Sequence, residues 1–179
     1  DYGAVGEYAV DFAIGEVWSR PGLSRRDRSL ITIAFLVTLQ SISALRFHLG
    51  VGLSHGLKSS EVEEIMVQLT GYAGFPRAIE GMRVARETFA VQGVEVEYPE
   101  VKNIKSDTQR RADARAVLAS MTTQISLDTV GVNMGSFTGA AGRFAFGDLW
   151  ARDDLSRRDR SLVVVATLVA QKMTKELRF

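Results

Sequence analysis

Two histidines are the residues of this sequence best suited to proton transfer at neutral pH, where an imidazole titrates near its ordinary pKa of about 6.5. They are His48 and His55. Helical spacing places His48 on one face with Ser41, Ala44 and His55. His48 is either a general acid or base, or a core histidine hydrogen-bonded to a neighbouring helix. His55 precedes Gly56 at an expected helix C-terminus, where the helix dipole favours a cation, so its position favours a structural role.

Arginines crowd the start of one expected helix. Arg25, Arg26 and Arg28 fall in its first turn, and the same arrangement returns over residues 157–160. The helix dipole disfavours cations at this end, so something must compensate for them. Either acids of a neighbouring subunit form salt bridges, or the guanidinium groups and helix amides bind an anionic ligand. Aromatic residues do not alternate with these arginines, so nucleic acid is not expected as a partner.

Three aromatic residues are further candidates for a binding site. Trp18 and Trp150 occupy equivalent places before the arginine-rich segments, as core anchors or as platforms for a ligand. Tyr72 lies in a turn rich in glycine, where its phenol either caps a helix or reaches a pocket.

Composition narrows the classes of function. The 179 residues hold 22 Lys and Arg against 21 Asp and Glu, and 46% are hydrophobic, as expected of a globular cytoplasmic protein. There is no cysteine, which excludes disulfides, thiolate metal sites and cysteine nucleophiles. Two histidines offer few ligands for zinc, so no metal is expected. No apolar stretch approaches the roughly 20 residues of a membrane span, so no membrane partner is expected either.

An internal repeat organises the chain. Residues 24–30 return letter for letter as residues 156–162. The offset of 132 pairs residues 1–47 with residues 133–179, and 21 of these 47 pairs are identical. Such self-similarity indicates two copies of one structural unit. We therefore expect a first copy over residues 1–92, a linker over 93–107, and the start of an incomplete second copy over 108–179.

Periodicity and capping signals predict helices nearly everywhere, and so an all-α fold. Ser24 and Asp27 form the pattern of a capping box at the start of one helix. Gly56 fits a C′ position, and Pro76 fits the N1 position of a later helix. The expected helices are one from Ser24, one over about 43–55, one from residue 59 or 60, one from Pro76, and one over about 108–124. A glycine-rich approach over 131–147 leads into the second copy.

Five spaced motifs are similar to one protein family. They are Gly15–Leu23, Arg26–Thr32, Leu45–His48, Gly56 with Glu61 and Glu64, and Tyr72–Pro76. In this order they resemble the carboxymuconolactone decarboxylase family, which belongs to the AhpD-like all-helical superfamily. The resemblance covers residues 12–90 and again 144–179, so the chain looks like a tandem two-copy member.

The resemblance separates two branches of this superfamily. Peroxidase-reductase members carry a CxxCxxxH motif, whose cysteine positions fall here on Ser41 and Ala44 and whose histidine falls on His48. Thiol peroxidase activity is thereby excluded. Decarboxylase members carry Glu-Leu-Arg-x-His. The second copy has Glu176-Leu177-Arg178-Phe179, whereas the first has Ala44 before His48, so neither copy shows both the acid and the base.

The resemblance implies a lyase of aromatic compound catabolism that decarboxylates 4-carboxymuconolactone, or a related enzyme acting on a lactone or cyclic ketone, without a cofactor. His48 and Glu176 would be the catalytic residues. The residues implied to bind the anionic acid or lactone are Arg28, Arg46, Trp18, Tyr72, Trp150 and Arg160. The alternative is a non-catalytic oligomeric or ligand-binding member. Because similar members form rings, a homo-oligomer is expected, most simply a trimer of tandem chains that imitates a hexamer.

Overall fold

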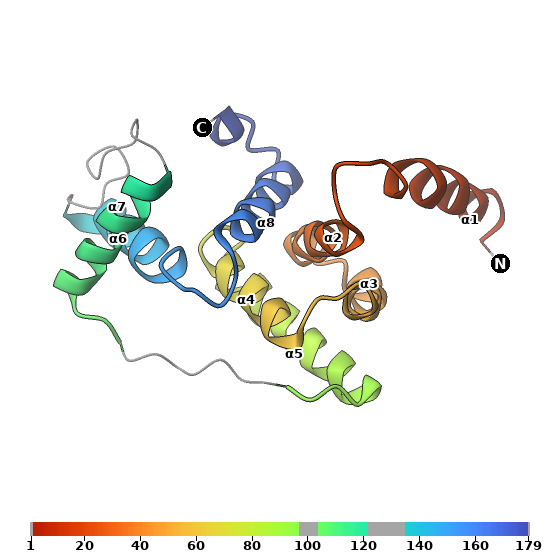
Figure 1. Cartoon of the computed structure of the whole chain (residues 1–179), viewed down its shortest axis with the longest axis horizontal. Helices are drawn as coiled ribbons and strands as arrows, with labels where there is room; N and C mark the ends of the chain where they lie inside the picture. The colour runs from red at the N-terminus through yellow and green to blue at the C-terminus, as the bar shows by residue number, and fades with distance from the viewer. Residues whose placement is uncertain (1, 97–103, 122–134, 179) are drawn as a thin grey trace.

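The computed structural model describes residues 2–96, 104–121 and 135–178 of the chain, and all regular structure in those ranges is helical (Figure 1). The all-α prediction is confirmed. The residues of the expected first copy form α1 (Gly3–Tyr8), the π-helical η1 (Ala9–Trp18), α2 (Arg25–Leu39), α3 (Ile42–Ser54), α4 (Ser59–Thr70) and α5 (Phe75–Gln92). After it come α6 (Asp107–Met121), α7 (Ser136–Gly142), the π-helical η2 (Arg143–Leu149), α8 (Arg157–Ala170) and the 3-10 helix η3 (Glu176–Arg178).

Local signals set several of these helix ends. The Ser24 hydroxyl accepts a hydrogen bond from the Asp27 amide at 3.1 Å, and the Asp27 carboxylate accepts one from the Ser24 amide at 3.1 Å. The predicted capping box at the start of α2 is therefore confirmed. Gly56, just past the end of α3, has a φ of +94°, as expected of a C′ residue. Pro76 is the second residue of α5 and not the first, because the helix begins at Phe75.

Helix α2 lies at the centre of the core, with α3, α4, α5 and α8 packed around it (Figure 1). The residues of α2 spaced for one helical face, Leu30, Ile33, Ala34 and Val37, are fully buried. Because these side chains recur at a helical period, their burial ties α2 to several neighbouring helices at once.

The second copy shares this core. Helix α8 packs against α2 and α4, and its Val163 joins the same buried cluster as Leu30 and Ile65. Parts of the predicted linker, of the helix expected to reach residue 124, and of the glycine-rich approach lie outside the described residues. The proposed division at residues 93–107 remains a prediction. Among the described residues, no helix is both long and apolar enough to span a membrane.

Helices α1 and η1 form one continuous rod at one end of the molecule, beside α2 and α3 (Figure 1). The sequence predictions did not single out this segment as a helix. Many of its apolar side chains face solvent, including Val5, Tyr8 and Phe12. Its inner face closes the space over α2 and α3 where the candidate site lies.

Candidate functional site

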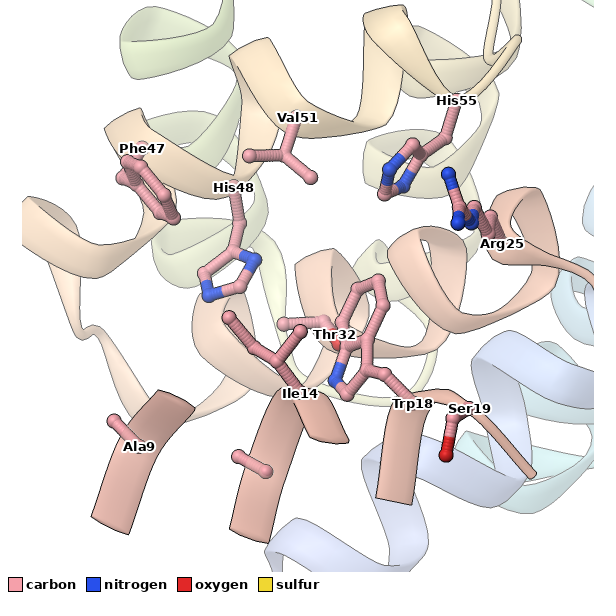
Figure 2. Close-up of a pocket in the computed structure, with 11 residues that line it drawn as sticks. Ala9, Ile14, Trp18, Ser19, Arg25, Thr32, Phe47, His48, Val51 and His55 are labelled. Atoms are coloured by element: carbon pink, nitrogen blue, oxygen red, sulfur yellow. The ribbon is translucent and has the colours of Figure 1, made fainter. Parts of the chain in front are cut away.

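A pocket of about 620 Å³ lies between η1, α2 and α3 (Figure 2). Its walls include Ile14 and Trp18 from η1, Arg25 and Thr32 from α2, and Phe47, His48, Val51 and His55 from α3 and its C-cap. These walls combine apolar surface with two imidazoles, one indole and one guanidinium group. A pocket of this size with a few convergent polar groups suits a small organic ligand.

His48 projects from the middle of α3 into this pocket (Figure 2). Its ring stacks beside the indole of Trp18, with centroids 6.2 Å apart and planes at 28°, and the Phe47 ring meets it edge-on at 5.2 Å. The Nδ1 atom of His48 is buried and has no hydrogen-bond partner among the described residues. The geometry therefore differs from that of a histidine bonded to a neighbouring helix.

Burial lowers the pKa of His48 below its ordinary value, because the charged imidazolium loses hydration. Burial thus favours the neutral ring at neutral pH. An anion bound beside the ring would favour the protonated form and raise its pKa again. A bound anion can therefore favour the protonated His48 that a proton transfer at this position needs.

His55 is held differently from His48. A hydrogen bond of 2.9 Å joins its Nδ1 atom to the hydroxyl of Ser29, a buried residue of α2. Its ring also lies 5.8 Å from the indole of Trp18, between centroids. His55 therefore fixes the end of α3 to α2 while its ring forms part of the pocket wall.

Arg25 supplies the positive charge of the pocket, and in Figure 2 its guanidinium group lies beside the His55 ring. The sequence named Arg25 only as one of three arginines that could bind an anion, and Thr32 was not among the predicted binding residues. Arg25, Ser29 and Thr32 are spaced four and three residues apart on α2, so they share one face. That spacing was the available sequence signal, but it needed the position of η1 to show that this face lines a pocket.

Of the predicted binding residues, Trp18 lines the pocket with His48, whereas both predicted first-copy arginines lie outside its walls. Arg46 forms an ion pair of 2.5 Å with Glu87 of α5. Arg28 donates a hydrogen bond of 2.6 Å to the carbonyl oxygen of Arg20.

The other predicted residues lie in the second copy or contact it. Trp150 is buried, and its indole N–H donates to the Tyr72 hydroxyl at 2.6 Å. Burial raises the pKa of Tyr72 above its ordinary value. Arg160 is fully buried against α4, and Glu176 lies exposed in η3. Their predicted roles in catalysis or binding remain predictions.

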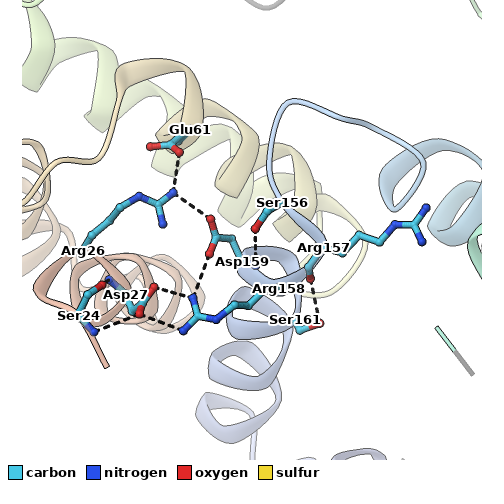
Figure 3. A network of polar contacts seen from close by, with 9 residues as sticks. All are labelled: Ser24, Arg26, Asp27, Glu61, Ser156, Arg157, Arg158, Asp159 and Ser161. Carbon is cyan, nitrogen blue, oxygen red and sulfur yellow. Dashed lines mark hydrogen bonds and ion pairs between the residues drawn. The ribbon is translucent and has the colours of Figure 1, made fainter. Parts of the chain in front are cut away.

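Within the arginine-rich helix starts, Arg26 and Arg158 are compensated by acids of the chain itself (Figure 3). Arg26 of α2 forms ion pairs with Asp159 at 2.9 Å and with Glu61 at 2.6 Å. In return, Arg158 of α8 contacts Asp27 at 2.8 Å. The compensating acids come from the other copy and from α4 of the same chain, whereas the sequence had suggested a neighbouring subunit or a bound anion.

Metal binding finds no support in the described part of the chain, where no group of three or more His, Asp and Glu side chains is placed to hold an ion.

Comparison with known proteins places these features in context. Residues 3–87 match the model of the carboxymuconolactone decarboxylase family. A 4-carboxymuconolactone decarboxylase of Acinetobacter baylyi is 43% identical over 83 residues, which cover 46% of this chain and 62% of that enzyme. A nitrosuccinic acid decarboxylase of Metarhizium robertsii is 31% identical over 97 residues, which cover 54% of this chain and 68% of that enzyme. The chain thus spans less than two thirds of the first relative's length.

Proposed function

We propose that this chain, which belongs to the carboxymuconolactone decarboxylase family, decarboxylates a small organic acid in the pocket that contains His48. Both relatives named above are decarboxylases, of a carboxylated lactone in one case and of nitrosuccinic acid in the other. The first relative is the more similar over the matched segment, so a 4-carboxymuconolactone-type acid is the preferred substrate. A related lactone or cyclic ketone is the next choice.

The observation that carries the proposal is the unpartnered Nδ1 atom of His48 in a pocket that also holds Arg25. A guanidinium group binds carboxylates through charge-assisted hydrogen bonds. The imidazole is the usual side chain for moving a proton near neutral pH. Together they provide an anion-binding group and a proton carrier in one space.

The proposed decarboxylation needs no cofactor to accept the electron pair. The bond from the ring carbon to the carboxylate breaks, carbon dioxide leaves, and the electron pair passes into the conjugated lactone as an enolate. A proton from the His48 imidazolium then returns to carbon, and the neutral ring is left behind. The substrate itself accepts the electron pair, which is the task that an electron-sink cofactor performs elsewhere.

A second candidate function follows from Ala44. This residue lies one helical turn before His48, where the decarboxylase motif has a glutamate. Among the described residues that line the pocket, none is a carboxylate. A chain that binds the acid without decarboxylating it fits this observation. Glu176, the equivalent of Ala44 in the second copy, lies in η3 and not in this pocket.

The two functions are separated by assaying the whole chain with 4-carboxymuconolactone in the presence of EDTA. Loss of lactone absorbance and trapped carbon dioxide are followed together with tryptophan fluorescence, which reports occupancy beside Trp18. The decarboxylase proposal predicts carbon dioxide equal to the lactone consumed. Saturable quenching without carbon dioxide would favour the binding function.

The expected assembly is part of the proposal. We propose a homo-oligomer in which the two copies occupy equivalent places, most simply a trimer of tandem chains. The exposed apolar side chains Val5, Tyr8 and Val10 of α1 and η1 support association. Light scattering that shows a monomer at all concentrations tested would contradict it.

A further inference from the structure

The second copy covers one side of the α4–α5 hairpin with a continuous set of side chains. The apolar pairs are Phe144 with Phe75, Leu149 with Gly71, and Trp150 with Tyr72. The Phe144 and Phe75 rings stack with centroids 5.9 Å apart. A Cβ atom at Gly71 would lie 2.6 Å from Leu149 Cδ1, so a larger residue at this position would make the Leu149 side chain shift.

Two arginines of the second copy continue this contact onto α4. Arg152 and Arg160 both donate to the carboxylate of Glu64, at 2.9 Å for the Arg160 contact, and Arg160 also donates to the Gln68 side chain at 3.0 Å. Glu64 and Arg160 are fully buried. One carboxylate and one carboxamide, a helical turn apart, therefore receive this pair of guanidinium groups.

The first copy carries equivalent side chains 132 residues earlier, here called the first-copy surface. Its members are Phe12, Val17, Trp18, Arg20 and Arg28. Phe12 is 56% exposed, and Val17 and Trp18 are only partly buried, whereas Leu149 and Trp150 of the second copy are buried. Among the described residues, no α4–α5 hairpin covers this surface.

Arg20 and Arg28 of the first-copy surface are arranged like Arg152 and Arg160 of the second copy. Arg28 donates to the carbonyl oxygen of Arg20 at 2.6 Å, just as Arg160 donates to the carbonyl oxygen of Arg152 at 3.1 Å. The Nε atom of Arg28 is buried and has no hydrogen-bond partner among the described residues. The Nε atom of Arg160 is also buried without a partner among these residues, although Glu64 contacts that arginine, so the two arginines share one local arrangement.

The two copies also meet in a reciprocal way. Arg26 pairs with Asp159, and its equivalent Arg158 pairs with Asp27, the equivalent of Asp159 (Figure 3). Reciprocal contacts of this kind mark a twofold relation, in which each half presents the same surface to the other. By that relation, the contact of the second copy with α4–α5 predicts an equivalent contact on the first-copy surface.

We propose that the first-copy surface is the docking site of a second helical hairpin with the chemistry of α4–α5. That hairpin carries a glutamate, a glutamine four residues on, and a tyrosine in the turn that follows. The glutamate enters between Arg20 and Arg28, and the tyrosine accepts the indole N–H of Trp18. Because Trp18 also stacks on His48, docking fixes one wall of the pocket.

The partner is a further hairpin and not the one described in this chain. In this chain, the Glu64 carboxylate already accepts a hydrogen bond from Arg160, and the Tyr72 hydroxyl already accepts one from Trp150. Another folded molecule of the same chain therefore has its α4–α5 hairpin already in use. A polypeptide segment of the same sequence pattern, joined to the chain or supplied separately, satisfies the requirement.

The test appends a second copy of residues 48–92 directly after Phe179, which repeats the order of the first copy. Docking of the appended hairpin is expected to slow amide hydrogen exchange in η1 at least about tenfold, because local opening then requires undocking. Arg28→Gln should remove this protection, and so should Glu64→Gln made in the appended segment alone. Combining the two changes should add little. Arg83→Gln, on the exposed face of α5, is the matched control and should leave the protection intact.

A labelled peptide of residues 57–92 provides the same test in trans, with binding to the unextended chain weakened at least tenfold by Arg28→Gln. Since such a peptide can fail to fold alone, the extended chain decides. An appended segment that stays unfolded, or that folds without slowing exchange in η1, overturns the proposal. Self-association of the unextended chain that Arg28→Gln abolishes would overturn the choice of partner.

Discussion

Glu64 holds the second copy to the first, and its replacement gives the sharpest prediction about stability. Two guanidinium groups donate to its carboxylate, which is fully buried, and one of them belongs to the equally buried Arg160. Glu64→Gln keeps the volume of the side chain but removes its charge. The buried Arg160 is then left without a counter-charge, which costs about 3–5 kcal/mol.

This cost converts into an expected drop in melting temperature. For a chain of this size, about 1 kcal/mol shifts Tm by roughly 2–4 °C, so Glu64→Gln should lower Tm by about 6–20 °C. Circular dichroism melts and urea titrations on the same samples measure the change. The matched control is Glu80→Gln, which removes a partly exposed partner of Arg83 and should leave Tm almost unchanged.

The result that would refute this reasoning is a Glu64→Gln variant as stable as the control. A second variant guards against a trivial loss of folding. Replacing Glu64 and Arg160 together by methionine removes both buried charges and should recover most of the lost stability. If the double replacement is as damaging as the single one, the lost stability comes from packing and not from the unpaired charge.

Three further predictions concern named contacts. The ion pair with Arg158 holds the pKa of Asp27 well below its usual range, so the stability that Asp27 contributes is present above about pH 4 and is lost as pH falls further. In Asp27→Asn, the midpoint of urea unfolding should therefore change less with pH in that range. Tyr72→Phe leaves the buried Trp150 N–H without its acceptor and should cost about 1–3 kcal/mol, seen in melts together with a change in tryptophan emission. Arg25→Gln should raise KM roughly tenfold with a smaller change in kcat, measured by carbon dioxide release, because its charge binds the substrate carboxylate.

Much of the first copy follows from local sequence signals. The capping box of Ser24 and Asp27, the helical period of the buried α2 residues and the positive φ of Gly56 all depend on residues close together in the chain. Such signals are readable because helices form through contacts within a turn or two. The structure shifts the expected start of α5 by only one residue.

The contacts between the copies could not be predicted from such local signals. Arg26 and Asp159 stand 133 residues apart, and the sequence showed only that cations at a helix start need compensation. The source of the compensating acid depends on how α8 packs against α2. Reciprocal pairing became visible only when both repeats were placed in one core.

The candidate site was predictable in part. His48 was identified from its side-chain chemistry, and the stacking of Trp18 on it depends on η1, a segment without a clear helical signal. Arg46 was named because it belongs to the Leu45–His48 motif of the family resemblance and its guanidinium group could hold a carboxylate. Two residues apart on a helix means about 200° around its axis, so Arg46 lies away from the pocket, where it meets Glu87.

Carbon dioxide release by His48→Gln tests the central proposal most directly. His48 is expected to supply the proton, so this variant should lose about 10²-fold in kcat with 4-carboxymuconolactone while its Tm stays close to that of the unaltered chain. His55→Gln breaks the bond to Ser29 and should lower Tm instead, which makes it the matched control. A His48→Gln variant that releases carbon dioxide at the unaltered rate would contradict the assignment of His48 and of this pocket.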